Sequence, residues 1–182
     1  MRKLLLVLIL ACITGASLFA WNPEDLTKFP ACMDGKSWIL NFGIGFYIPE
    51  MPGSDSYIPQ IRATLDRNIE IGNKKLPFFV GGIFGYSGYG SKNRWFNHNI
   101  SIGGRFGYHL NFDIKNLDTY AVTTAGWIIY AGSKTNNNNL GLPLLGANFG
   151  VRYFVSNSFG FWAEAGLSTS LSILDIGLTF KF

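Results

Sequence analysis

The sequence is poor in charged residues and in cysteine. Of its 182 residues, 14% are charged, whereas 48% are hydrophobic and 16% are aromatic; an average soluble domain has about 25% charged residues. This composition excludes a disordered chain, because disordered segments are highly charged and contain few aromatic residues. The two cysteines are too few for a disulfide framework. The formal net charge is only +4, so a nucleic-acid partner is not expected.

The first 20 residues have the pattern of a cleaved export signal. Residues 1–3 form a short basic start, 4–11 an unbroken apolar run, and 12–20 a tail rich in small residues, with Ala20 as the expected last residue before cleavage. The apolar run is shorter than the roughly 20 residues that a membrane-spanning helix needs. A signal peptide over 1–20 is therefore favoured over a membrane anchor.

The segment between this signal and the first strand is expected to be a periplasmic leader, at 21–36. It contains Cys32, which we interpret as a lone and unreactive thiol. One alternative stays open, because residues 9–12 resemble a lipoprotein cleavage box, which would make Cys12 a lipidated first residue.

After residue 21 the sequence has little helical periodicity and no apolar run of 18 residues, so no membrane helix is expected. Apolar and polar residues instead alternate with a period of two, which is typical of strands with two different faces. The alternation predicts eight strands, at about 38–48, 60–69, 78–86, 96–110, 120–131, 145–153, 159–168 and 174–182. In the fifth of these strands both faces carry apolar residues, so the face that points into the lumen stays open.

An even number of strands of this length predicts an all-β fold, an eight-stranded antiparallel up-and-down transmembrane β-barrel over 37–182. The alternative is a soluble β-sandwich or a lipocalin-like barrel. A soluble surface needs about 25–35% charged residues, and the polar faces here consist mainly of Gly, Ser, Asn and Thr. Such faces can fill a narrow lumen, which leaves the apolar faces for lipid.

The few charges within the predicted strands share the polar face. A Lys or Arg on the lipid face at mid-membrane costs roughly 2–4 kcal/mol, and a slip of one residue would turn these charges outward. Only Arg67 and His98 oppose the register. We expect a polar network in the lumen that consists of Arg62, Asp66, Arg105, Arg152, Glu164 and Asp175. Two interpretations of this network stay open: it is purely structural, or it gates a narrow conduit.

The connections alternate between longer and shorter ones, as in outer-membrane barrels with short periplasmic turns. The longer, outer loops are expected at 49–56, 87–95, 132–141 and 168–172. The shorter, inner turns are expected at 70–75, 111–118 and 156–158. Aromatic residues near the strand ends predict two interfacial belts. The outer belt would contain Tyr47, Tyr57, Tyr86, Trp95, Phe96 and Tyr130, and the inner belt Trp38, Phe78, Tyr108, Tyr120, Tyr153, Phe159, Phe180 and Phe182.

The last strand carries the most specific motif. Asp175, Gly177, Phe180 and Phe182 fill a pattern of a polar residue, a glycine, and two aromatic residues at fixed spacing. This motif resembles the β-signal of bacterial outer-membrane proteins, which implies recognition by the barrel-assembly machinery. Together with the eight strands, it makes the chain similar to the small barrels of outer-membrane proteins X, W and A. The resemblance covers about 37–182, and only the last strand matches residue by residue.

The resemblance implies an integral protein of the cell outer membrane that contacts outer-membrane lipids, and we expect a monomer. Eight strands enclose an interior just wide enough for side chains, so a large pore is excluded. We therefore expect a structural role or a minor permeability role for small or hydrophobic solutes. A surface adhesin that uses the loops at 49–56 and 132–141 is the alternative from another class.

An enzyme is not expected, although some eight-stranded barrels modify lipid A. The deacylase type has a His and a Ser two residues apart, but here Ile100 follows His98 and Asn111 follows His109 at that spacing. No catalytic residues are therefore assigned. The two histidines and Cys32 are too scattered for a metal site, so neither a metal nor another cofactor is expected.

Overall fold

The computed structural model describes residues 29–33, 35–46, 56–71, 74–91, 95–132, 141–169 and 172–182. The signal peptide predicted at 1–20 and the alternative lipidation of Cys12 lie outside these residues. Within the described part of the chain, no helix is long and apolar enough to cross a membrane.

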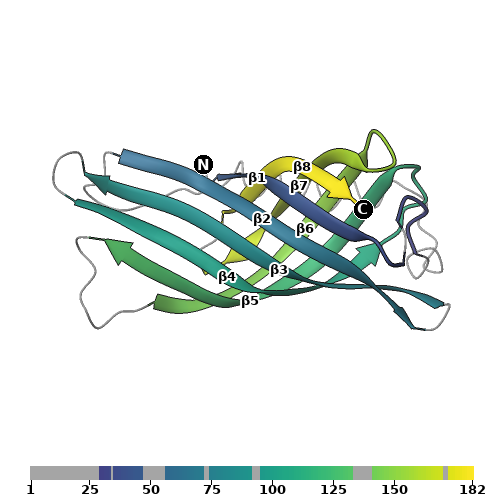
Figure 1. Ribbon diagram of the computed structural model, residues 1–182, viewed down its shortest axis with the longest axis horizontal. Helices are drawn as coiled ribbons and strands as arrows, with labels where there is room; N and C mark the ends of the chain where they lie inside the picture. The colour runs from purple at the N-terminus through teal and green to yellow at the C-terminus, as the bar shows by residue number, and fades with distance from the viewer. Residues whose placement is uncertain are drawn as a thin grey trace, which may run out of the picture.

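The described strands form a closed antiparallel barrel (Figure 1). Each strand pairs with the next in sequence, and the last pairs with the first, so the predicted all-β, eight-stranded up-and-down barrel is confirmed. Closure pairs every strand on both sides and removes the open edges that would be costly in lipid. The strands are β1 (Trp38–Phe46), β2 (Ser56–Ile71), β3 (Lys74–Ser91), β4 (Trp95–Leu110), β5 (Leu117–Gly132), β6 (Gly141–Phe154), β7 (Phe159–Ser168) and β8 (Leu174–Lys181).

The alternation of side chains places apolar residues outside and polar residues inside. In β1, Phe42 is 52% exposed, whereas the adjacent Asn41 is fully buried. In β4, Ile102 and Phe106 are 55% and 49% exposed, whereas Arg105 between them is 4% exposed. In water such an exterior would promote aggregation; in lipid it is the stable arrangement.

Four neighbouring strands, β2 to β5, are longer than the rest and extend past β1, β7 and β8 at the end away from the C-terminus (Figure 1). The predicted outer loop at 87–95 is therefore wrong for most of its length, because Ser91 of β3 still pairs with Trp95 of β4. Glycine and serine at 87–91 favour a loop by residue type, but the cross-strand pairing with β4 continues through these residues. The predicted inner turn at 111–118 is also too long, since β5 begins at Leu117.

The fifth strand, which the sequence left open, turns Tyr120, Val122 and Ile128 into the lumen. Tyr120 was predicted in the inner aromatic belt, but it is fully buried inside the barrel. Its ring occupies the space over Gly150, where a Cβ atom would lie 2.1 Å from the Tyr120 Cζ atom. Glycine on one strand thus makes room for a large side chain from its neighbour.

Tyr130 is a second aromatic residue that was assigned wrongly to a belt. It packs against an apolar cluster of Ile83, Ile128 and Leu144, all of which are at most 3% exposed. This cluster lies in the lumen toward the outer end of the barrel, because Ile128 and Leu144 are near the outer ends of β5 and β6.

The described end of the leader, residues 29–33 and 35–37, covers the opposite mouth of the barrel. Met33 packs on Ile39 and Phe154, with Phe29 and Cys32 alongside. The ring of Phe29 contacts that of His109 edge-on, with 5.6 Å between the centroids. The Lys181 ammonium donates a hydrogen bond to the Cys32 carbonyl oxygen at 2.6 Å. These contacts attach the leader to the inner end of the lumen.

Candidate functional site: the polar network in the lumen

The six residues predicted for the lumen network all lie inside the barrel and are at most 4% exposed. They come from five strands, β2, β4, β6, β7 and β8, and meet because each occupies an inward position of the alternation. The structure joins all six through ion pairs: Arg62, Asp66, Arg105, Arg152, Glu164 and Asp175.

Glu164 is the centre of the network. Its carboxylate accepts hydrogen bonds from Arg62, from Arg105 Nη2 at 2.8 Å, from Asn148 Nδ2 at 2.8 Å and from the Tyr120 hydroxyl at 2.9 Å. Four donors saturate the acceptor capacity of one carboxylate. Arg62 also pairs with Asp175, which extends the network toward the outer end of β8.

A second part of the network surrounds Arg152 nearer the inner mouth. Its guanidinium pairs with Asp66 and donates to Asp118 Oδ2 at 2.8 Å. It also lies over the Tyr120 ring, with Cζ 4.1 Å from the ring centroid. Arg105 links the two parts, because its Nε atom lies 3.0 Å from Asp66 Oδ1. The charges therefore form one continuous chain from Asp175 to Asp118.

Two charged or titratable members, Asp118 and His109, were missed by the sequence analysis. Asp118 was assigned to a turn, but it is the second residue of β5 and is fully buried. His109 was considered only for a catalytic or metal site; its Nδ1 atom lies 2.6 Å from Asp118 Oδ1 and its Nε2 atom 3.0 Å from Asn68 Oδ1. The alternation of β4 could have indicated His109, whereas Asp118 required the true start of β5.

Large aromatic side chains also belong to this layer, although the polar faces were expected to consist mainly of Gly, Ser, Asn and Thr. Trp162 Nε1 donates to the Tyr120 hydroxyl at 2.7 Å, and both residues pack with Phe79 and Val122. Aromatic rings therefore fill the space that the charged groups leave. The expected lumen of small polar residues is corrected to a lumen packed by aromatic residues and ion pairs.

Several polar atoms in the lumen have no hydrogen-bond partner among the described residues. Arg105 Nη1 and Thr124 Oγ1 are examples, and Arg105 and Thr124 are cross-strand partners. Buried polar atoms in such positions are usually satisfied by ordered water. We expect isolated water molecules here, enclosed by the network.

The arrangement is suited to holding strands together rather than to catalysis. Three guanidinium groups and four carboxylates form ion pairs with one another, and removing one partner of such a buried pair is strongly destabilising. The network therefore does not support an enzymatic function, and the expectation that the protein is not an enzyme stays a prediction.

Arg67 and His98, the two polar residues that the alternation placed on the lipid face, do lie on the outer face of the barrel. Arg67 is exposed, and its guanidinium carbon lies 5.1 Å from the centroid of the Trp38 ring. His98 Nδ1 lies 2.8 Å from the Tyr86 hydroxyl oxygen. A polar partner or a position near a strand end makes each of them tolerable on this face.

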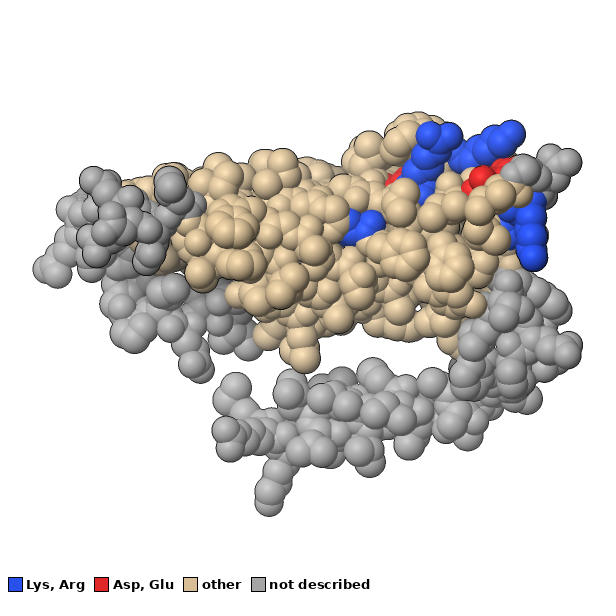
Figure 2. Space-filling model, turned by 90° about the horizontal axis from the view of Figure 1, so that it is seen from below, with Lys and Arg blue, Asp and Glu red and all other residues tan. Residues whose placement is uncertain are grey.

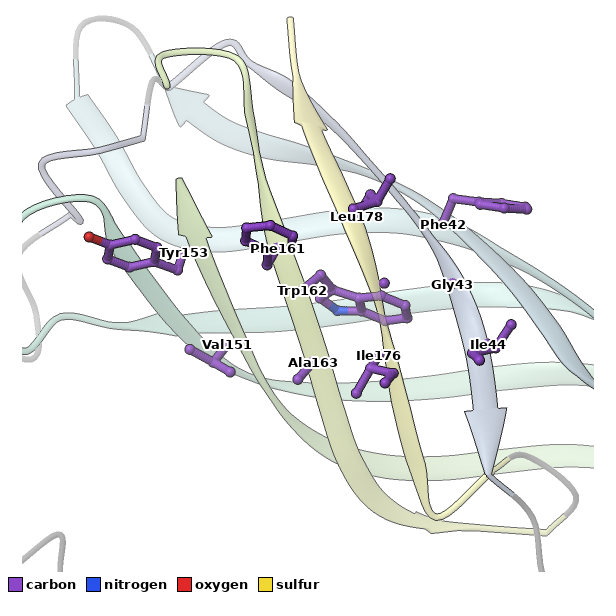
Figure 3. Close-up of a pocket in the computed structure, with 11 residues that line it drawn as sticks. Phe42, Gly43, Ile44, Val151, Tyr153, Phe161, Trp162, Ala163, Ile176 and Leu178 are labelled. Carbon is purple, nitrogen blue, oxygen red and sulfur yellow. The ribbon is translucent and has the colours of Figure 1, made fainter. Parts of the chain in front are cut away.

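The exterior has an apolar hollow of about 680 Å³ over β6, β7, β8 and β1 (Figure 3). Val151, Phe161 and Ile176 surround the small side chain of Ala163, which leaves the depression in the wall. The side chains that line it are hydrophobic apart from the Tyr153 hydroxyl, because the Trp162 side chain faces the lumen. The hollow therefore fits acyl chains of the surrounding lipid.

The four residues of the terminal motif lie on the strand that closes the barrel. Asp175 faces the lumen and pairs with Arg62, whereas Phe180 and Phe182 are 37% and 68% exposed. Gly177 is the cross-strand partner of Gly43, and a Cβ atom at Gly177 would lie 2.1 Å from the Phe42 carbonyl oxygen. The motif glycine is thus required by the close approach of β8 to β1. Recognition by the assembly machinery stays a prediction.

A closed wall of eight strands, an apolar exterior and an ion-paired interior define an eight-stranded transmembrane β-barrel, the architecture of the small outer-membrane barrels. No family model and no curated protein matches the chain. Among solved structures, the chain is similar to the outer membrane protein Ail of Yersinia pestis, whose backbone structure was determined in a phospholipid bilayer nanodisc. The identity is 14%, with a TM-score of 0.45, over 82% of this chain and 100% of that chain. At this level of similarity, nothing about the function of Ail carries over.

Proposed function

We propose that this protein is an integral outer-membrane protein whose barrel is closed to solutes and whose role is structural. The observation that carries the proposal is the filled lumen. Ion pairs occupy its middle, Ile83, Ile128 and Leu144 fill the outer level, and Met33 with the leader covers the inner mouth. Of the two interpretations that the sequence left open, this packing favours the structural network over the gated conduit.

Location in the outer membrane is supported by the exterior of the barrel and by two sequence features. The strands present an apolar surface to lipid, with no unpaired charge at mid-height among the described residues. The export signal predicted at 1–20 and the terminal motif at 175–182 belong to the same route of export and assembly. On this proposal, the end that carries the leader and the short turns faces the periplasm.

Conductance of the refolded protein tests whether the lumen is closed. We expect planar bilayers that contain the wild-type protein to show no discrete openings. The same preparation must show heat-modifiable gel mobility, which establishes that the barrel has folded. Discrete openings of wild-type protein would contradict the structural role and support a narrow conduit instead.

A second candidate is a surface adhesin, and one observation favours it. The long strands β2 to β5 extend past β1, β7 and β8 at the outer end, so this side of the barrel projects further from the membrane (Figure 1). The loops that were predicted to bind lie largely outside the described residues. Adhesion of bacteria that produce the protein to cultured epithelial cells, compared with bacteria that produce a variant lacking 133–139, tests this role. Equal adhesion by both strains would contradict it.

A further inference from the structure

The charges on the exterior of the described barrel all lie at its inner end. Apart from the buried network, every described charged residue lies before β1, near the inner ends of β2, β3 and β8, or in the turn before β5. Figure 2 shows most of the visible Lys and Arg toward one end of a surface that is otherwise mostly tan, with one further blue patch nearer its middle. Six cations and two carboxylates make up this inner rim: Lys36, Arg67, Lys74, Lys75, Lys115 and Lys181, with Glu70 and Asp113.

Three of these residues contact the leader and do not face the bilayer. Lys181 donates to the Cys32 carbonyl oxygen, and the Lys75 ammonium lies 5.6 Å from the Phe29 ring centroid. A Cβ atom at Gly35 would lie 2.5 Å from Glu70 Oε2, which places Glu70 against the leader as well. The remaining four cations, Lys36, Arg67, Lys74 and Lys115, are all exposed; we call them the basic rim.

Two members of the basic rim lie on the same face as the lipid-contacting residues. Arg67 is the cross-strand partner of Trp38 and stacks on its ring. Lys74 is the cross-strand partner of Ile71, which is 68% exposed. A long basic side chain beside an interfacial tryptophan can keep its methylenes in the apolar layer and its charge at the level of the headgroups.

We infer that the basic rim binds the phosphate groups of anionic phospholipids, of the phosphatidylglycerol class, in the leaflet that borders the inner end of the barrel. The inference rests on the proposed function, which places this end at the periplasmic leaflet. Four cations against the single exposed carboxylate of Asp113 supply the charge complementarity. Arg67 and Lys74 border the apolar surface, so a lipid phosphate reaches them without leaving the bilayer.

The test measures the association of spin-labelled phosphatidylglycerol and phosphatidylcholine with the full-length protein in vesicles of phosphatidylcholine. We expect wild-type protein to prefer phosphatidylglycerol, and the preference to weaken as salt is added. The triple variant Arg67→Gln, Lys74→Gln, Lys115→Gln should lose the preference, a change of about fivefold or more, given the attraction that each basic residue near an anionic surface adds.

The matched control removes the same charge elsewhere. Lys92→Gln, Arg94→Gln, Lys134→Gln changes three cations that the sequence places in the connections from β3 to β4 and from β5 to β6, away from the inner rim. This variant should retain the wild-type preference. Loss of the preference in the control but not in the rim variant would overturn the inference, and so would a wild-type protein with no preference.

Two further readouts separate this inference from its premises. Heat-modifiable mobility of every variant shows that the barrel has folded; a wild-type protein without it would refute the proposed function itself. Co-sedimentation with purified peptidoglycan tests a different anionic partner. If the wild-type protein shows no lipid preference and the rim variant loses binding to peptidoglycan, the basic rim binds peptidoglycan and the assignment to phospholipid is wrong.

Discussion

The charged residues inside the lumen and those at the inner rim differ in the cation that they use. All three lumen cations are arginines, whereas five of the six rim cations are lysines. Each lumen arginine bridges two carboxylates: Arg62 pairs with Glu164 and Asp175, Arg105 with Asp66 and Glu164, and Arg152 with Asp66 and Asp118. At the rim, Lys181 instead donates a hydrogen bond to a backbone oxygen, that of Cys32.

The difference shows what burial demands of a charged side chain. A guanidinium group presents five donors in a planar fork, so it can satisfy two carboxylates at once in a place without free water. An ammonium group is a compact and strongly hydrated charge, which suits a position that borders water or lipid headgroups. The same charge should therefore have very different energetic importance in the two regions.

The largest effect is expected from removing the central carboxylate of the lumen. Glu164→Ala deprives four donors of their acceptor and should lower the free energy of unfolding by about 3–5 kcal/mol. Glu70→Ala at the rim should change it by about 0–1 kcal/mol, because surface ion pairs contribute little. Urea unfolding in lipid vesicles, followed by tryptophan fluorescence, measures both. Equal losses would abolish the distinction between the two regions.

A smaller effect is expected from adding one arginine to the lipid face at two heights. Ile102→Arg, near the middle of β4, should lower the free energy of unfolding by about 2–4 kcal/mol. Ile71→Arg, at the inner end of β2, should cost about 0–1 kcal/mol, since headgroups and water are within reach. The same unfolding assay checks the depth dependence. A greater cost at position 71 would show that the membrane boundary is placed wrongly.

Exchanging the two kinds of cation tests the comparison directly. Arg152→Lys keeps the charge but cannot reach both Asp66 and Asp118, so it should cost about 1–3 kcal/mol for a buried group left unsatisfied. Lys115→Arg at the rim should leave stability within about 0.5 kcal/mol. If the lumen accepts lysine without loss, the fork geometry is not what the network requires.

The smallest effect concerns the thiol in the leader that covers the inner mouth. Burial, and secondarily the charge of Asp118, raise the pKa of Cys32 to about 11, above the value of about 8.5 for a free cysteine. The resulting stabilisation is fully present below about pH 8.5 and is lost as the pH rises toward the folded-state value. At pH 8, alkylation of folded protein should be at least about tenfold slower than in urea. Equal rates would show that the leader does not cover this thiol.

The register of the barrel could be predicted because one physical rule acts locally. Period-two alternation decides which face of each strand is polar, and it placed Arg62, Arg105 and Glu164 inside without knowledge of any partner. The rule failed in β5, where both faces are apolar. It also failed between Ser87 and Ser91, where residues that are typical of turns remain part of a strand and pair with β4. It also left Asp118 in a turn, because strand ends are not encoded by alternation.

By itself, the sequence determined the all-β class, the number of strands and the side of the wall on which the six predicted network charges lie, because these depend on neighbouring residues along one strand. Only the tertiary structure decided that Arg152 meets Asp118, that Tyr120 fills the lumen over Gly150, and that the leader at 29–33 covers one mouth. These contacts depend on the stagger between strands and on the closure of β8 against β1. No pattern within a single strand contains that information.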